Sequence, residues 1–99
     1  MDSYNVKSSI IGLVVGDALG VPYEFTSKED MLKNPCSTMA GYGSWNQPPG
    51  TWSDDTSMTL ATIDSIIRNK GSINLDSIMK NFTRWLVNND FTQYNNTFD

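Results

Sequence analysis

The stretch that decides how this chain folds is Gly50-Thr51-Trp52-Ser53-Asp54-Asp55-Thr56-Ser57-Met58, where a loop rich in proline and glycine leads into a predicted helix. Ser53 is placed to cap that helix, because a serine hydroxyl accepts from backbone N–H groups that the first turn leaves unpaired. Asp54 and Asp55 fall in the first turn, where the positive end of the helix dipole stabilises negative charge. Helix capping alone therefore accounts for this acidic start.

The same three residues also form a compact set of hard oxygen ligands. Consecutive helical residues point about 100° apart, so Asp54 and Asp55 project from neighbouring positions beside Ser53. Carboxylate and hydroxyl oxygens suit Mg²⁺, Mn²⁺ or Ca²⁺ rather than soft metals. Three residues cannot complete a coordination sphere, so further oxygens have to come from elsewhere. Spacing alone leaves the cap and the metal site both open.

Composition narrows the kind of chemistry that the chain can carry. With 99 residues and 38% hydrophobic residues it fits one small, folded, soluble domain. A net charge of −4 and the absence of a basic run argue against nucleic acid or an anionic membrane surface as a partner. No histidine and a single cysteine, Cys36, exclude an imidazole base, an internal disulfide and a cysteine–histidine zinc site within these residues. Any catalytic chemistry within these residues therefore has to rely on carboxylates, hydroxyls and a bound metal.

Apolar periodicity predicts an all-α, multi-helical fold, with no segment that alternates as a strand would. The run Val6–Leu19 is so densely apolar that it predicts a helix buried on most sides and ended by Gly20. Further helices are expected at Ser27–Lys33, Asp54–Asn69 and Leu75–Val87. The expected core residues of the last two helices are Met58, Ala61, Thr62, Ser65, Ile66, Leu75, Ile78, Met79, Phe82, Trp85 and Leu86.

Two segments bear on location and binding. The apolar run Ile10–Leu19 is too short to span a bilayer, contains Asp17 and lacks a clean cleavage site after it, so we expect a cytoplasmic protein. The segment Asn34–Trp52 combines glycines, prolines and aromatic residues, which predicts a long ordered loop of the kind that often acts as a lid or a binding loop.

Three glycines, Gly12, Gly16 and Gly20, recur every four residues along one stripe of the first helix. Each interior glycine costs helix stability, about 0.8–1 kcal/mol relative to alanine. The stripe therefore predicts close approach, either by another helix, which we favour, or by a ligand. Asp17, on the same helix, needs a partner because a buried unpaired carboxylate is costly. A structural hydrogen bond to a loop and an acceptor beside a metal site both satisfy that need.

Glu24 stands between Tyr23 and Phe25, where the chain leaves the first helix. A carboxylate partly shielded by aromatic rings suits acid–base work. An ordinary surface glutamate explains the same pattern.

Together, Ile11-Gly12-Leu13-Val14-Val15-Gly16-Asp17-Ala18-Leu19-Gly20-Val21-Pro22-Tyr23-Glu24 and the stretch 50–58 resemble the N-terminal part of the ADP-ribosylglycohydrolases. The resemblance implies an all-helical fold with a dinuclear Mg²⁺ or Mn²⁺ centre. It implies hydrolysis of the bond between ADP-ribose and a modified protein side chain or small aglycone. By this resemblance Ser53, Asp54 and Asp55 are metal ligands and Glu24 is a substrate-contacting or catalytic residue. Asp17 would then accept a hydrogen bond beside the metal site without binding the metal itself.

The resemblance covers nearly all of the chain but only about the first third of a usual family chain. The aspartate cluster that completes the metal site in family members is not among these 99 residues. We therefore expect residues 1–99 to be an N-terminal fragment of such a hydrolase domain, inactive by itself. The alternative is a non-catalytic helical interaction or structural module derived from the same fold. Surplus apolar faces on the last two helices predict self-association or an exposed patch of roughly several hundred Å².

Overall fold

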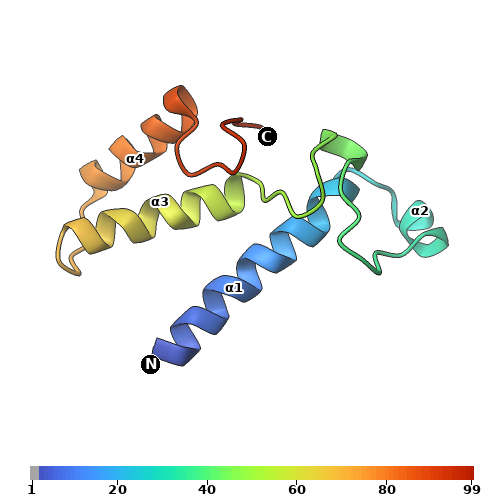
Figure 1. Cartoon of the computed structure of the whole chain (residues 1–99), viewed down its shortest axis with the longest axis horizontal. Helices are drawn as coiled ribbons and strands as arrows, with labels where there is room; N and C mark the ends of the chain where they lie inside the picture. Colours follow the sequence, from blue (N-terminus) through green and yellow to red (C-terminus); the bar gives the residue numbers. More distant parts are fainter. Residues whose placement is uncertain (1–2) are drawn as a thin grey trace. The chain divides into compact units, whose positions relative to one another are not determined.

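The computed structural model describes residues 3–99, and the all-α class predicted from the sequence is confirmed for them (Figure 1). The elements in chain order are α1 (Ser3–Gly20), the 3-10 helix η1 (Val21–Tyr23), α2 (Lys28–Lys33), the 3-10 helix η2 (Gly43–Trp45), α3 (Asp54–Arg68) and α4 (Leu75–Asn88). No strand occurs in this range. The chain divides into two compact units, an N-terminal unit that ends at Ser53 and a C-terminal unit that begins at Asp54.

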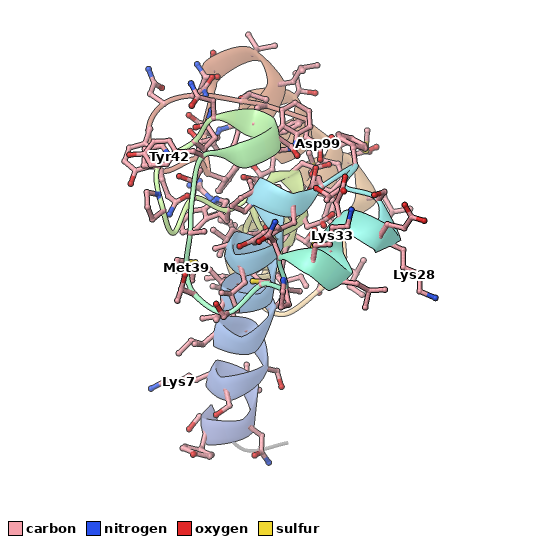
Figure 2. All side chains as sticks on the ribbon, turned by 90° about the vertical axis from the view of Figure 1, so that its right-hand side faces the viewer. Lys7, Lys28, Lys33, Met39, Tyr42 and Asp99 are labelled. Carbon is pink, nitrogen blue, oxygen red and sulfur yellow. The ribbon has the colours of Figure 1, made fainter. Side chains whose placement is uncertain are left out.

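Helix α1 is longer than predicted, and its expected burial is wrong. Ala18 is its one buried residue, whereas the side chains of Ile11, Leu13 and Val15 are 62%, 41% and 43% exposed. Figure 2 shows Lys7 pointing away from the same helix. Within its unit α1 contacts η1 at its C-terminal end, and the unit's second α-helix, α2, has only 6 residues. A helix that is apolar on all sides cannot be buried without enough surrounding surface.

The favoured explanation of the glycine stripe, close packing of another helix, is also wrong for the described residues, whereas close approach by a ligand stays a prediction. A Cβ atom placed on Gly12, Gly16 or Gly20 would meet no heavy atom within 4 Å. The stripe therefore has no packing partner here.

By length and composition alone, the segment Ser3–Tyr23 could cross a membrane, as could many core helices and N-terminal signal sequences. This corrects the expectation that the apolar segment is too short, because the helix continues on both sides of Ile10–Leu19. A cytoplasmic location stays a prediction.

The predicted start of the second helix is confirmed, since Ser27 caps α2 by accepting a hydrogen bond at 3.1 Å from the backbone N–H of Asp30. The long loop after α2 is ordered, as predicted, and contains η2. On either side of η2, Tyr42 and Gln47 form an isolated antiparallel bridge, in which the Tyr42 N–H donates to the Gln47 carbonyl at 2.5 Å. This bridge closes a compact turn at residues 42–47.

In the C-terminal unit, α4 returns along α3 after a short turn (Figure 1). Both helices begin at the predicted residue and end within one residue of the prediction. Gly71 ends α3 as expected, because it adopts φ +91° and its N–H bonds to the Ile66 carbonyl at 2.8 Å. Asn74 caps α4 by accepting from the N–H of Ser77.

The core of this unit is more polar than predicted. Ala61 and Ser65 are buried as expected, together with Thr56 and Ser57. On α4 the expected apolar face is wrong in part: Ile78, Phe82 and Trp85 are half-buried, but Leu75, Met79 and Leu86 are exposed and the buried residue is Asn81.

Asn81 is accommodated because each of its polar atoms has a partner. Its Nδ2 donates to the Ala61 carbonyl at 2.8 Å and to Oδ2 of Asp64 at 3.0 Å, and its Oδ1 accepts from Arg84 at 3.1 Å. Arg84 also pairs with Asp90 at 2.8 Å. These contacts connect the two helices to the C-terminal segment.

Candidate active-site residues

The first predicted site residue, Asp17, lies within hydrogen-bonding distance of Ser53 in the N-terminal unit. Oδ1 of Asp17 accepts from the Ser53 hydroxyl at 2.6 Å, and Oδ2 accepts from the Ser53 backbone N–H at 2.9 Å. Ser53 is only 2% exposed, so this pair of bonds is largely shielded from water. The half-buried carboxylate of Asp17 therefore has the partner that its place in an apolar helix requires.

The direction of the hydroxyl bond matters for what Ser53 can do. Because its proton is donated to Asp17, the Oγ lone pairs are directed away from that carboxylate. An oxygen in this state can accept a hydrogen bond or coordinate a cation. Asp17 thus determines which side of the Ser53 hydroxyl donates a hydrogen bond and which side can accept one. This arrangement fits both alternatives that the sequence left open for Asp17, a structural hydrogen bond and a place beside a metal site.

Asp54 and Asp55 open α3, so Ser53 occupies the position directly before the first turn, as predicted. Asp54 is half-buried and Asp55 is exposed. The Asp55 carbonyl accepts from the Thr59 hydroxyl one turn later. Acidic side chains here are favoured by the helix dipole whether or not a cation binds.

Within residues 3–99, no three histidine, cysteine, aspartate or glutamate side chains gather as metal ligands would. The Ser53, Asp54 and Asp55 side chains nevertheless offer only hard oxygen donors, which is the chemistry that Mg²⁺ and Mn²⁺ prefer. The donor set fits such a cation in type and falls short of it in number.

Glu24 follows η1 and is held by residues that the sequence did not single out. Its Oε2 accepts from the indole N–H of Trp45 at 2.5 Å. Its backbone carbonyl accepts from the Ser44 hydroxyl, which also lies 3.3 Å from the Pro22 carbonyl. The half-buried Glu24 is therefore more constrained than an ordinary surface glutamate.

The preceding residue, Tyr23, contacts Cys36. Partial desolvation and, to a smaller extent, the Cys36 thiol raise the pKa of Tyr23 above its ordinary value. The Cys36 sulfur also lies 3.7 Å from the Leu19 carbonyl and 3.8 Å from the Thr38 carbonyl. Both effects favour the neutral hydroxyl of Tyr23 over its phenolate.

The structure joins Asp17 to Ser53 and Glu24 to Trp45. The predicted roles of these residues stay predictions. They are acid–base or substrate contact for Glu24, support of the metal ligands for Asp17, and metal binding for Ser53, Asp54 and Asp55. The aromatic character of the long loop was the one sequence signal for Trp45, and it did not indicate which residue the indole would contact.

Comparison with known proteins gives a consistent assignment. The family model described as ADP-ribosylglycohydrolase matches residues 3–98. The ADP-ribosylarginine hydrolase Tri1 of Serratia proteamaculans (strain 568) is 31% identical over 93 residues, which cover 94% of this chain and 24% of that protein. The ADP-ribosyl-[dinitrogen reductase] glycohydrolase of Rhodospirillum rubrum is 36% identical over 80 residues, which cover 79% of this chain and 27% of that protein. The chain spans about a quarter of the length of these relatives. It belongs to the ADP-ribosylglycohydrolase family.

Proposed function

We propose that residues 1–99 form the N-terminal part of a metal-dependent hydrolase that removes ADP-ribose from modified proteins or small ADP-ribosyl compounds. Family membership supports the reaction class. Two relatives carry the name ADP-ribosylarginine hydrolase, so an ADP-ribosylated arginine side chain is the first substrate to test. The observation that carries most weight is the pairing of Asp17 with Ser53 directly before the two aspartates of α3.

In this proposal the Ser53 hydroxyl and the carboxylates of Asp54 and Asp55 hold Mg²⁺ or Mn²⁺. When bound, such a cation polarises substrate oxygens and makes a bound water more acidic. Asp17 accepts a hydrogen bond from the Ser53 hydroxyl and so turns the acceptor side of Oγ away from its own carboxylate. Asp17 also fixes the Ser53 backbone through its N–H at the residue where α3 is about to begin.

Glu24 has the second role in the proposal. Its carboxylate can hold a proton or release one to a leaving group or water. The indole N–H of Trp45 holds that carboxylate, and the Ser44 hydroxyl holds the backbone carbonyl of the same residue. In general acid–base catalysis the position of the proton-transferring group is the first requirement, and its pKa is the second.

We further propose that the 99 residues do not turn over substrate by themselves. A Mg²⁺ ion demands about six oxygen ligands in near-octahedral geometry, and Ser53, Asp54 and Asp55 supply three side chains. Binding of Mg²⁺ or Mn²⁺ should therefore be weak. The remaining ligands would come from the part of the family fold that lies outside the matched quarter.

The test is a chimera in which residues 3–98 replace the matching segment of the Serratia proteamaculans relative. We expect Mn²⁺-dependent release of ADP-ribose from an ADP-ribosylarginine peptide. Asp54→Ala or Asp55→Ala should lower kcat/KM by at least about 100-fold, whereas Asp76→Ala, an exposed carboxylate in the first turn of α4, should leave it unchanged. A chimera that keeps full activity after Asp55→Ala would overturn the metal-ligand assignment.

The isolated chain supplies the complementary measurement. Titration calorimetry should show weak Mn²⁺ binding that Asp55→Asn abolishes, and no ADP-ribose should be released. EDTA-sensitive hydrolysis by the purified 99-residue chain would refute the proposed incompleteness. Tight binding of Mn²⁺ that survives the substitution would place the ligands elsewhere.

A further inference from the structure

The contact between Trp45 and Glu24 joins two short 3-10 helices of the N-terminal unit. The indole Nε1 of Trp45, in η2, lies 2.5 Å from Oε2 of Glu24, the residue that follows η1. An indole N–H only donates, and an ionised carboxylate only accepts. Hydrogen bonds with one charged partner are shorter and stronger than neutral ones. The contact is partly buried, which protects it from competition by water.

The turn at residues 42–47 is built so that Trp45 faces Glu24. Tyr42 and Asn46 both have a positive φ, 59° and 52°, and the Asn46 N–H bonds back to the Tyr42 carbonyl at 3.1 Å. The side-chain amide of Gln47 donates to the Trp45 carbonyl at 3.2 Å. The position of the indole is therefore set by the backbone of a closed turn.

The turn also lies directly against η1. Gly43 has φ +55°, and a Cβ atom on it would overlap the carbonyl group of Pro22. The Ser44 hydroxyl donates to the Glu24 carbonyl and lies 3.3 Å from the Pro22 carbonyl. Close approach at Gly43 is thus what allows the next two residues to reach Glu24.

A third contact fixes the plane of the indole. The ring centroids of Phe25 and Trp45 are 6.0 Å apart, with the rings inclined at 59°. Phe25 reaches Trp45 because its φ of 65° turns the chain sharply after Glu24. Phe25 remains 87% exposed, so this contact orients the indole and does not bury the phenyl ring.

We propose that Trp45 is a positioning residue for Glu24. The indole N–H of Trp45 donates to Oε2 of Glu24, while the Ser44 hydroxyl donates to the backbone carbonyl of Glu24. Within residues 3–99, Oε1 of Glu24 accepts no hydrogen bond, so the arrangement leaves that oxygen for the proton that Glu24 handles. This role rests on the function proposed above, because it assumes that Glu24 takes part in the reaction.

The first test concerns the contact alone and uses the 99-residue chain. Its three tryptophans, Trp45, Trp52 and Trp85, give three indole N–H resonances in a proton–nitrogen spectrum. The Trp45 resonance is assigned by its loss in Trp45→Phe. Glu24→Gln removes the charge of the acceptor and should move the Trp45 resonance upfield while the other two stay in place. The matched variant Glu29→Gln, an exposed carboxylate of the same unit, should move none. A Trp45 resonance that does not respond to Glu24→Gln overturns the proposal.

The second test concerns catalysis and uses the chimera. Trp45→Phe keeps an aromatic ring beside Phe25 and removes the N–H donor. We expect kcat to fall about 10- to 100-fold, because a displaced acid–base group loses near-attack geometry, with KM changed by less than about 3-fold. The double variant with Glu24→Gln should be no slower than Glu24→Gln alone, since both changes remove one function. Tyr42→Phe, which alters an exposed side chain of the same turn that points outward (Figure 2), should be neutral.

The outcomes separate this inference from the proposed function. Full turnover by Trp45→Phe, with Glu24→Gln inactive, would overturn the positioning role and leave the proposed function standing. Full turnover by Glu24→Gln would refute the role of Glu24, and with it the positioning role, whatever the first test shows of the contact. A purely structural role for Trp45 would lower the amount of folded protein without the split between kcat and KM and would add to the effect of Glu24→Gln, which would also overturn the inference.

Discussion

The α-helices of the two units differ in which of their residues they bury. The N-terminal unit contains the most apolar helix, α1, and buries only Ala18 of it. The C-terminal unit buries Thr56, Ser57, Ser65 and Asn81 on its two helices. A helical residue is therefore buried where another element packs against it and satisfies its hydrogen bonds. The apolar content of the helix alone does not predict which residues are buried.

The difference has a simple physical basis. The hydrophobic effect acts only on surface that another element can cover, and α1 meets short 3-10 and loop segments within its unit. Helices α3 and α4 meet through small polar residues, which let the two helices approach closely. The Ser65 hydroxyl donates to Ser77 at 2.7 Å, and the Asn69 amide donates to the Ser65 carbonyl at 2.7 Å and to Ser77 at 3.0 Å. Each buried polar group is satisfied, so its burial costs little.

The largest expected effect comes from removing the central amide of the C-terminal unit. Asn81→Leu removes three hydrogen bonds made by a buried amide, to the Ala61 carbonyl and to the half-buried Asp64 and Arg84, and should lower the free energy of unfolding by about 2–4 kcal/mol. Urea unfolding followed by far-UV circular dichroism measures it. Asn88→Leu, at an exposed position of the same helix, should change it by less than about 0.5 kcal/mol. A variant at Asn81 as stable as the wild type would show that an apolar core serves equally well and would remove the contrast between the units.

The matching change in the N-terminal unit is Asp17→Ala. It removes the acceptor of the Ser53 N–H and hydroxyl, which are buried, and should destabilise that unit by about 1–3 kcal/mol. Amide hydrogen exchange at Ser53 should become faster, and Asp17→Asn, which keeps one acceptor oxygen, should fall between the two. Glu29→Ala should leave the exchange unchanged. Unaltered exchange at Ser53 in the alanine variant would mean that this unit does not depend on its long-range polar contacts.

A pair of glycines tests whether the turn at residues 42–47 needs close approach. Gly50 has φ +85° and open space around it, so Gly50→Ala should cost only the backbone strain of the left-handed region, about 1–2 kcal/mol. Gly43→Ala adds an overlap with the Pro22 carbonyl and should cost at least about 1 kcal/mol more. Thermal unfolding measures both changes, and the Trp45 indole resonance should shift only in Gly43→Ala. Equal costs would show that the turn can move away from η1 freely.

The smallest effect on folding is expected on the exposed surface of α1. Ile11 is 62% exposed, so Ile11→Lys should change the free energy of unfolding by less than about 0.5 kcal/mol. The sequence predicts self-association from the apolar faces of α3 and α4, and the exposed apolar residues of α1 favour it as well; in Ile11→Lys it should become weaker in sedimentation experiments. A wild-type chain that is monomeric at all concentrations and binds no apolar dye would contradict that prediction.

Local signals in the sequence determined most of the secondary structure. Ser27 and Asp30 fixed the start of α2, and Gly71 fixed the end of α3. These signals act between residues three to five apart, where the chain itself brings the groups together. The two motifs around Asp17 and at residues 50–58 also sufficed to indicate the family, which the family comparison confirmed.

Tertiary structure decided which side chains meet. Asp17 and Ser53 are 36 residues apart, and Glu24 and Trp45 are 21 apart. The burial of Asn81 likewise depends on a carbonyl 20 residues away in another helix. No periodicity or composition encodes such pairings, because they depend on how loops and helices close in space. The sequence alone singled out Asp17 and Glu24 as candidate site residues, and only the folded chain showed which donors hold their carboxylates in place.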